Sequence, residues 1–362
     1  MPKILAAFVL LCSSFALAGT KFAPPVTYTT GDLAPNGVAV GDLNGDGHLD
    51  VVVSNTDNPG TIAVLLGNGD GTLQAPVTYA AGSWPQFLLI ADFNKDGHPD
   101  VAVVNRAIGT PGQVLIFLGN GDGTFKAPVA YGPFTDAFSL AVGDFKRDGK
   151  LDIAVADSRS GSLLLGKGDG TFTYGSSIGA TNVLGFAVAD FNRDHKLDLV
   201  AANNNGSQVQ MLLGNGKGTF TLSSTYSVAT PPIALLAKDL NGDGIPDFVA
   251  SDEAVNNLDS NVTVFLSSGN GYVGTEYQYG AEPRSISFGA FNGRSDIVTA
   301  NEFNGNLDIF LNEGKGVFAP PIVLPDGGLN AAYLAVGDLN GDKKPDIVVT
   351  DGLYDVRVIL QE

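Results

Sequence analysis

The segment Asp42-Leu-Asn-Gly-Asp-Gly-His-Leu-Asp50, followed by the apolar run Val51–Val53, is repeated along the chain. Close copies occupy residues 92–100, 144–152, 190–198, 239–247 and 338–346, and a shortened copy occupies 290–296. The seven copies start at residues 42, 92, 144, 190, 239, 290 and 338, a period of about 50 residues. Such a period indicates a repeat architecture, in which each unit buries its apolar face against its neighbours.

Each repeat contains four short segments with the composition of β-strands. In the first repeat these segments are 37–43, 50–54, 61–66 and 72–79, and turns rich in Gly, Asn, Asp and Pro separate them. Helical periodicity is absent from residue 19 onward. Four strands in each of seven repeats predict an all-β fold, a seven-bladed β-propeller of four-stranded blades over residues 19–362. A parallel β-helix is the weaker alternative, because its coils are shorter than this period.

Both ends of the chain favour a closed ring. The chain stops after a third strand at 356–360, where a Gly-rich turn and a fourth strand should follow. The segment Thr20–Tyr28 matches the fourth-strand region Thr124–Tyr131 in the middle of the chain. We therefore expect the N-terminal segment to supply the outer strand of the last blade, which leaves no open interface in the ring.

Residues 1–18 have the features of a secretory signal peptide. Lys3 precedes an apolar stretch, and Ala16-Leu-Ala18 forms a small-x-small cleavage site. The single cysteine, Cys12, lies within this segment, so no disulfide is expected after cleavage. No later segment is long and apolar enough to predict a membrane span. The sequence thus predicts a secreted protein, extracellular or periplasmic, that is a monomeric propeller.

The net charge of −18 comes from 38 Asp and Glu against 20 Lys and Arg. Nucleic acids and anionic membrane surfaces need clustered basic groups, so neither is an expected partner. Many of the acids stand in the repeated segments, which we call the Asp loops. This concentration favours a local cation over a generally acidic surface.

The Asp loops place oxygen atoms at a spacing suited to a bound Ca²⁺ ion. Side chains at positions 1, 3, 5 and 9 and the backbone carbonyl at position 7 provide oxygens, while glycine at position 6 permits a sharp turn. An EF-hand is rejected, because it requires glutamate at position 12, where Val53, Val103 and Ala250 stand. The alternative is an Asx-rich turn that binds no ion.

The copies differ in completeness, and the strongest sites are expected in blades one, two and five. Their ligands are Asp42, Asn44, Asp46, His48 and Asp50; Asp92, Asn94, Asp96, His98 and Asp100; and Asp239, Asn241, Asp243, Ile245 and Asp247, with His48, His98 and Ile245 acting through their carbonyls. Weaker sites are expected in blades four and seven, from Asp190, Asn192, Asp194 and Asp198 and from Asp338, Asn340, Asp342 and Asp346. In these two loops His195 and Lys343 replace the glycine. In blade three Lys146 replaces the asparagine and its ammonium competes for the place of the ion, so this loop is not counted among the expected sites. Blade six lacks the first aspartate and is expected to bind no ion.

The Asp loops and the Gly-rich segments 67–76 and 119–128 together resemble the FG-GAP or VCBS repeat family, which includes the N-terminal propeller of integrin α subunits. The resemblance covers nearly the whole chain after the signal segment. It implies a seven-bladed propeller with Ca²⁺ loops between the first and second strands on one face. It also implies that partners bind on the opposite face.

Candidate ligand residues are expected on that opposite face, in the strand 2–3 turns and the connections between blades. They are Trp84, Arg106, Phe134, Arg159, Arg284 and Tyr354. Glu253 and Phe303 lie in the same kinds of turn and connection and are further candidates. The alternative is that these residues only fill the junctions between blades, and this applies above all to Trp84 beside Pro85. Inserts at 105–113 and 251–261 are further candidates for recognition.

Two functions fit this sequence. The first is a secreted calcium-binding propeller that acts as a binding or adhesion module for an extracellular protein or glycan. The second is a polysaccharide hydrolase or lyase that uses acids near the propeller axis. No catalytic residue is assigned, because all three histidines lie within Asp loops and no Ser-His-Asp or Cys-His arrangement is indicated.

Overall fold

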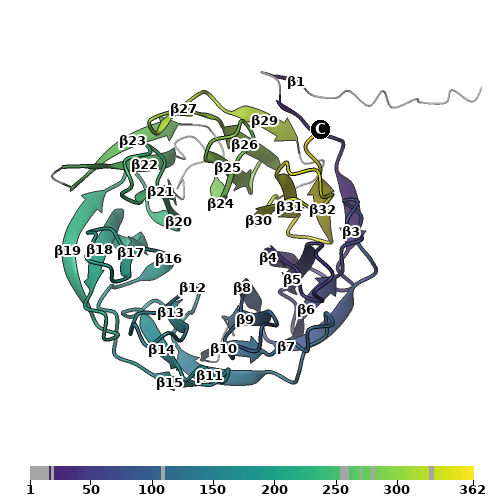
Figure 1. Cartoon of the computed structure of the whole chain (residues 1–362), viewed down its shortest axis with the longest axis horizontal. Helices are drawn as coiled ribbons and strands as arrows, with labels where there is room; N and C mark the ends of the chain where they lie inside the picture. Colours follow the sequence, from purple (N-terminus) through teal and green to yellow (C-terminus); the bar gives the residue numbers. More distant parts are fainter. Residues whose placement is uncertain are drawn as a thin grey trace, which may run out of the picture.

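The computed structural model describes residues 16–17, 20–106, 111–252, 261–269, 271–278, 282–325 and 330–362. Seven four-stranded antiparallel sheets stand as blades around a central axis (Figure 1). The predicted seven-bladed propeller is therefore confirmed. The one helical element of the described residues is a single 3₁₀ turn, η1 (Asn204–Gly206). No helix in this part of the chain is long and apolar enough to cross a membrane.

The blades follow one another in chain order, and each runs from an inner strand at the axis to an outer strand at the rim. Blade one contains β4 (Pro35–Gly41), β5 (Asp50–Asn55), β6 (Gly60–Leu65) and β7 (Val77–Gly82), and blade two contains β8 (Pro85–Ala91), β9 (Asp100–Asn105), β10 (Gly112–Phe117) and β11 (Val129–Phe134). Blade three contains β12 (Ser139–Gly143), β13 (Asp152–Ala156), β14 (Ser162–Gly166) and β15 (Phe172–Tyr174). Blade four contains β16 (Val183–Ala189), β17 (Asp198–Asn203), β18 (Gln208–Gly214) and β19 (Phe220–Ser227).

The remaining three blades complete the ring. Blade five contains β20 (Pro232–Lys238), β21 (Asp247–Asp252), β22 (Asn261–Ser268) and β23 (Gly271–Gln278). Blade six contains β24 (Pro283–Gly289), β25 (Asp296–Asn301), β26 (Asn306–Phe310) and β29 (Ile322–Pro325), with a small hairpin of β27 (Asn312–Gly314) and β28 (Val317–Phe318) between its last two strands. Blade seven contains β30 (Leu334–Gly337), β31 (Asp346–Thr350), β32 (Asp355–Ile359) and β3 (Val26–Thr29).

The N-terminal segment closes the ring as the sequence predicts. Strand β3 pairs antiparallel with β32, with Val26 opposite Val358 and Thr29 opposite Asp355. An isolated bridge joins Phe22 to Gln361 and extends this contact toward the chain end. The last blade thus combines both ends of the chain. Of the predicted signal segment, only Ala16–Leu17 is described, as strand β1 paired with β2 (Thr20–Lys21); the rest lies outside the described residues.

Burial follows position within a blade. Every residue of the second strand β5 is buried, whereas most residues of the outer strand β7 are exposed. The cores lie between neighbouring blades, as in the cluster that joins Val52 and Val64 of blade one to Val103 and Phe117 of blade two. Because second strands are covered on both faces, their sequences are continuous apolar runs without alternation.

The fourth strand of the first repeat begins later than the sequence predicts, at Val77 instead of residue 72. Leu73 makes only an isolated bridge with Gly67, and Pro76 cannot donate a backbone hydrogen bond. The intervening residues form the Gly-rich turn between the third and fourth strands.

A ring of hydrogen bonds joins all neighbouring blades on the Asp-loop face. In each case the acceptor is the carbonyl of the second Asp-loop residue, or its blade-six equivalent, in the preceding blade. The donor lies just after the third strand of the next blade, except in blade five, where it is Tyr272 at the start of the fourth strand. The bonds are Gly71 N to Leu339 O, Gly123 N to Leu43 O, Gly170 N to Phe93 O, Gly218 N to Phe145 O, Tyr272 Oη to Phe191 O, Asn312 Nδ2 to Leu240 O and Gln361 Nε2 to Phe291 O. Glycine N–H groups of the Gly-rich turns thus fasten blades one to four to the blade before them, and side chains do so in blades five, six and seven.

Candidate functional site

The Asp loops connect the inner strand to the second strand of each blade, so they share one face of the propeller. In the first loop, Asp42 Oδ1 accepts a hydrogen bond from Gly45 N (2.8 Å) and Asp42 Oδ2 accepts one from Gly47 N (2.9 Å). Asn44 Oδ1 accepts from Asp46 N, and Asp46 Oδ1 accepts from His48 N (2.8 Å). These bonds bring the side chains at positions 1, 3 and 5 around one turn of backbone.

The second and fifth loops repeat this geometry. Asp92 Oδ2 accepts from Gly97 N, and Asp239 Oδ2 accepts from Gly244 N. Asp96 Oδ1 accepts from His98 N, and Asp243 Oδ1 accepts from Ile245 N. The asparagines Asn94 and Asn241 accept from the backbone of position 5. The loops expected to be most complete are thus built alike.

The fourth and seventh loops keep the same turn despite lacking its glycine. Asp190 Oδ2 accepts from His195 N, and Asp338 Oδ2 accepts from Lys343 N. Asn192 and Asn340 accept from Asp194 N and Asp342 N. His195 and Lys343 have φ of 62° and 67°, so position 6 requires the left-handed region, as Gly47 shows with φ of 85°. The substitution costs roughly 1–2 kcal/mol in each loop.

The aspartate at position 9 behaves differently from the other loop acids. Asp50 is fully buried; its Oδ2 accepts from Leu43 N and its Oδ1 from Gly67 N, both at 2.8 Å. The equivalent acids are also fully buried and accept backbone amides: Asp100, Asp152, Asp198, Asp247, Asp296 and Asp346. Position 9 therefore ties the loop to the turn after the third strand.

Burial and neighbouring acids set the protonation of these groups. Burial raises the pKa of Asp50, and the charges of Asp46 and Asp42 add to the shift. The same causes raise the pKa of Asp198 to about 6. At exposed position 5, the His48 backbone N–H lowers the pKa of Asp46. The loops thus hold clustered negative charge whose ionisation a cation would favour.

The oxygen donors of the loops suit a hard cation such as Ca²⁺. In blade three, where lysine replaces the asparagine, Lys146 Nζ lies 2.9 Å from Asp148 Oδ2 and places a positive charge among the loop acids. In blade six, Arg294 donates to Asn312 O and lowers the raised pKa of Asp296. Protein cations also stand beside the acids of the fourth and seventh loops, where Lys196 Nζ lies 2.8 Å from Asp194 Oδ2 and Lys344 Nζ lies 3.4 Å from Asp342 Oδ2.

Within the described residues, no three His, Cys, Asp or Glu side chains converge as closely as a preformed metal site requires. The position 9 carboxylate turns toward backbone amides, which leaves two carboxylates and one amide oxygen around each complete loop. The carbonyl at position 7 and solvent would have to complete the coordination of an ion.

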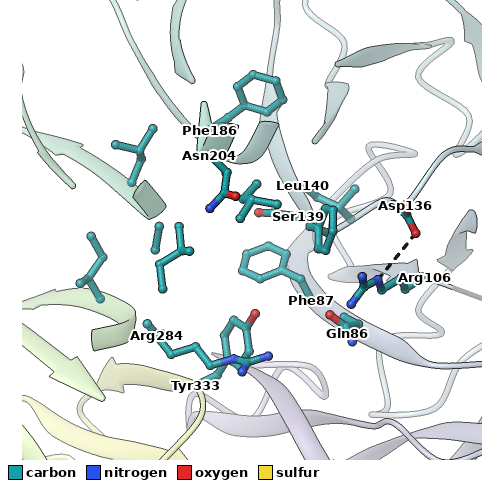
Figure 2. Close-up of a pocket in the computed structure, with 18 of the residues that line it drawn as sticks. Gln86, Phe87, Arg106, Asp136, Ser139, Leu140, Phe186, Asn204, Arg284 and Tyr333 are labelled. Carbon is teal, nitrogen blue, oxygen red and sulfur yellow. Dashed lines mark ion pairs between the residues drawn. The ribbon is translucent and has the colours of Figure 1, made fainter. Parts of the chain in front are cut away.

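The opposite end of the axis contains a pocket of about 590 Å³, which we call the axial pocket. The starts of inner strands and the connections between blades line it. Phe87 and Leu140 supply apolar surface, Asn204 supplies an amide, and Arg106 and Arg284 stand on different sides (Figure 2). The pocket therefore combines aromatic and charged groups from several blades, as small-molecule sites do.

Each arginine of the axial pocket is paired with a carboxylate and lies against an aromatic ring. Arg106 Nε is 3.8 Å from Asp136 Oδ1, and the guanidinium is 4.6 Å from the centre of the Phe138 ring. Arg284 Nη1 donates to Glu302 Oε2, and its guanidinium lies 5.9 Å from the Tyr333 ring centre. These contacts orient both guanidinium groups at the pocket wall, through a hydrogen bond to Glu302 for Arg284 and through an ion pair and ring contact for Arg106.

The candidate ligand residues from the sequence fall into three groups. Arg106 and Arg284 line the axial pocket. Trp84, Arg159 and Tyr354 are exposed on the same face but outside the pocket lining, and Phe303 is exposed on the turn of blade six. The expectation for Phe134 is wrong: only 4% of it is exposed, because it packs in the core between blades two and three. Glu253 lies outside the described residues.

Sequence reasoning missed several pocket residues and one repeated position. Phe87, Asp136, Phe138 and Tyr333 line the pocket, but they occupy irregular connections or inner-strand starts and share no motif. A second repeated position does have a signal, since an Asn or Asp stands at or just after the end of every second strand. These buried residues are Asn55, Asn105, Asp157, Asn203, Asp252, Asn301 and Asp351.

Comparison with protein families matches five segments to the FG-GAP-like repeat: residues 42–103, 92–155, 144–201, 190–250 and 291–349. These segments together cover well over half of the chain. A search of the curated proteins finds no match.

Solved structures share the fold at low sequence identity. A chain in the mercury-soaked crystal structure of BBS1N in complex with ARL6DN has a TM-score of 0.65 at 14% identity, over 93% of this chain and 96% of that chain. An Agrocybe aegerita lectin, whose structure concerns recognition of non-reducing terminal N-acetylglucosamine, has a TM-score of 0.56 at 20% identity, over 88% and 86%. At these identities the likeness shows the fold alone.

Proposed function

The chain belongs to the FG-GAP-like repeat family, and from that premise we propose that it is a secreted, calcium-stabilised propeller that binds an extracellular protein or glycan. The axial pocket is the observation that supports this most directly. It lies at the end of the axis opposite the Asp loops, so binding and ion-dependent stability are assigned to different faces. Structural neighbours of the same fold include a protein complex and a glycan-binding lectin.

In this proposal Ca²⁺ stabilises the scaffold and takes no part in ligand binding. Asp42, Asn44, Asp46 and the His48 carbonyl would hold the ion in the first loop, and Asp50 would orient the loop from beneath. The ion would neutralise the clustered acids, whose mutual repulsion otherwise opposes the folded loop. The equivalent residues of blades two and five would act in the same way.

Thermal melting with and without chelator tests the calcium component. An ion present at about a hundred times its Kd would stabilise the fold by about 2.7 kcal/mol per site, so chelation should lower Tm. A melting curve that is the same in Ca²⁺ and in chelator would remove the calcium component.

The ligand component is tested by a glycan array and a pull-down from extracellular material, followed by direct titration of any ligand found. We expect Arg284→Ala to weaken binding at least tenfold, because it removes a charged donor at the pocket wall and leaves Glu302 unpaired. Arg193→Ala is the matched control, since Arg193 is exposed on the Asp-loop face, where it contacts Asp243 O. Equal loss in both variants would place the ligand elsewhere.

A polysaccharide hydrolase or lyase is the second candidate, and one observation favours it. Asp136 and Glu282 line the same pocket as Arg284 and Tyr333, so carboxylates, a guanidinium and a phenol occur together near the axis. Incubation with polysaccharides, followed for reducing ends and for unsaturated products, distinguishes the candidates. Binding without turnover supports the first function, and turnover that is lost in a Tyr333→Phe variant supports the second.

A further inference from the structure

A second group of oxygen-bearing side chains lies in blade five, away from both the Asp loop and the axial pocket. In the sheet register, Ala250 of β21 is opposite Thr263 of β22, and Thr263 is opposite Glu276 of β23. Side chains two residues apart in a strand share a face. Asp252, Asn261, Thr263 and Glu276 therefore point to one side of the sheet.

That side of blade five packs against blade four. Ala250 belongs to a core cluster with Ala202 and Val209 of blade four. The oxygen-bearing group lies next to this apolar contact, at the end of β21 that is farther from the Asp loop. Thr230, in the connection from blade four, also lies beside Asp252. The interface between blades four and five is thus apolar at Ala250, and the oxygen-bearing group occupies its end on the face opposite the Asp loops.

Glu276 is exposed, but the other members of the group are buried, and among the described residues the N–H and hydroxyl of Thr230 are the donors beside Asp252. The exposed fractions are 0% for Asp252, 1% for Asn261 and 2% for Thr263. Both carboxylate oxygens of Asp252, Asn261 Oδ1, Thr263 Oγ1 and Thr230 Oγ1 make no hydrogen bond of normal geometry there. A buried carboxylate without a partner is costly, and so are buried amide and hydroxyl oxygens.

The equivalent carboxylates in other blades are satisfied. In blade seven, Asp351 accepts from three backbone amides and pairs with Arg357 Nη2 at 3.0 Å. Arg357 pairs with Val349 in the sheet of blade seven, and Thr263 pairs with Ala250 in the sheet of blade five. Arg357 therefore stands at the position in blade seven that corresponds to Thr263 in blade five. In blade three, Asp157 accepts from two backbone amides and from Ser162 Oγ (2.6 Å). Within the described part of blade five, no basic side chain pairs with Asp252 as Arg357 pairs with Asp351, and Thr230 is the neighbour that offers donors to it.

We propose that a hard divalent cation, for which Ca²⁺ is the fitting ion, binds in blade five to Asp252, Asn261 Oδ1 and Thr263 Oγ1. The hydroxyl of Thr230 and the carboxylate of Glu276 complete an all-oxygen set with two negative charges. Ca²⁺ accepts such a mixture of carboxylate, amide and hydroxyl oxygens, whereas Mg²⁺ demands stricter octahedral geometry. Glu276 is exposed, which gives the ion a route from solvent.

This blade-five site is separate from the blade-five Asp loop. The loop ends at Asp247 and the site begins at Asp252, the two ends of β21. Five residues of extended strand separate them by about 17 Å. The two sites should therefore bind ions independently, and the ion at Asp252 would link β21, β22 and the connection from blade four.

The test is the number of Ca²⁺ ions bound per chain, measured by equilibrium dialysis of the whole secreted protein. We expect Asp252→Asn to remove one ion and Asp239→Asn, in the Asp loop, to remove another, with two lost in the double variant. Asp308→Asn is the matched control, because Asp308 occupies the corresponding face of blade six but already accepts from Asn301 Nδ2 (2.9 Å). It should leave the ion count unchanged.

A second variant keeps the test decisive if Asp252→Asn fails to fold. Thr263→Val preserves side-chain shape and removes one oxygen, so it should weaken one ion at least tenfold while circular dichroism stays unchanged. A full ion count with unchanged affinities in folded Asp252→Asn, or in Thr263→Val, overturns the proposal. If the Asp loops bind no ion at all, the wild-type protein should still bind one Ca²⁺ at Asp252, and Asp252→Asn should remove it. The blade-five site can therefore be tested separately from the Asp-loop sites.

Discussion

Single aspartates at position 9 fasten the Asp loops to the sheets by hydrogen bonds alone. Blade six shows this most clearly, because it keeps Asp296 but has lost the first loop aspartate. Asp296 Oδ1 accepts from Asn312 N and Oδ2 from Asn292 N, and the carboxylate is fully buried. The tether is therefore useful even in a blade where no ion is expected.

Replacing Asp296 by alanine should destabilise the propeller by about 2–6 kcal/mol, because two backbone amides lose their buried acceptor at about 1–3 kcal/mol each. Denaturant unfolding in chelator measures the change. The neighbouring Ser295→Ala serves as control and should change the free energy of unfolding by less than about 0.5 kcal/mol. Equal effects of the two substitutions would contradict a tethering role.

Asp308 provides a prediction of pH dependence at the residue scale. Burial raises its pKa, and the hydrogen bond from Asn301 opposes the shift only in part. Since the folded-state pKa lies above the unfolded value, its contribution to stability is present in acid and is lost as pH rises above about 4. Asp308→Asn keeps an acceptor for Asn301 and removes the titration. Its stability relative to wild type should increase from pH 4 to pH 8, and a constant difference would refute the argument.

Side-chain roles were only partly predictable from the sequence. The spacing of Asp42, Asn44 and Asp46 correctly marked a turn in which these side chains come together. The dual use of Asp50 by Leu43 N and Gly67 N was not foreseeable, because Gly67 is distant in sequence and follows another strand. Phe134 and Arg284 looked equally plausible as ligand residues. Only packing shows that one is in the core and the other lines the pocket.

At the scale of elements, each Asp loop and Gly-rich turn acts as one connected unit. The Gly67–Leu73 turn of blade one contacts its own Asp loop through Asp50 and the preceding blade through Leu339 O. The two motifs recur in fixed order because the Gly-rich turn bonds both to the Asp loop of its own blade and to the Asp loop of the preceding blade. Their regularity made the blades predictable. The axial pocket was not, because irregular connections such as that carrying Asp136 form it.

The third Asp loop can test whether the turn itself selects a cation. Lys146→Asn removes the ammonium that pairs with Asp148 and completes an Asp-x-Asn-x-Asp-Gly pattern at residues 144–149. We expect the variant to bind one more Ca²⁺ per chain than the wild type, as seen by equilibrium dialysis. Lys146→Met removes the charge without adding an oxygen and is the matched control. An equal ion count in both variants would show that the loop geometry does not hold an ion.

At the scale of the whole molecule, ring closure combines segments from opposite ends of the chain. Thr350 Oγ1 donates to Asn36 O across the junction between the last blade and the first, and Gly71 N donates to Leu339 O at the same junction. The sequence predicted this closure because the missing outer strand of blade seven had a recognisable match at the other terminus. The partner was less predictable, because the fold is shared by proteins that bind quite different ligands.

Deletion of residues 20–29 should therefore weaken the whole ring instead of one blade. It removes β3, which exposes the backbone edge of β32 and uncovers Val356 and Val358, both buried in the core between blades seven and one. Exposed edges promote association, so the variant should melt at lower temperature and elute as larger species in size-exclusion chromatography. Deletion of residues 1–15 is the control and should change neither property. A monomeric 20–29 deletion with wild-type Tm would mean that β3 merely covers a ring already closed by the interface between blades seven and one.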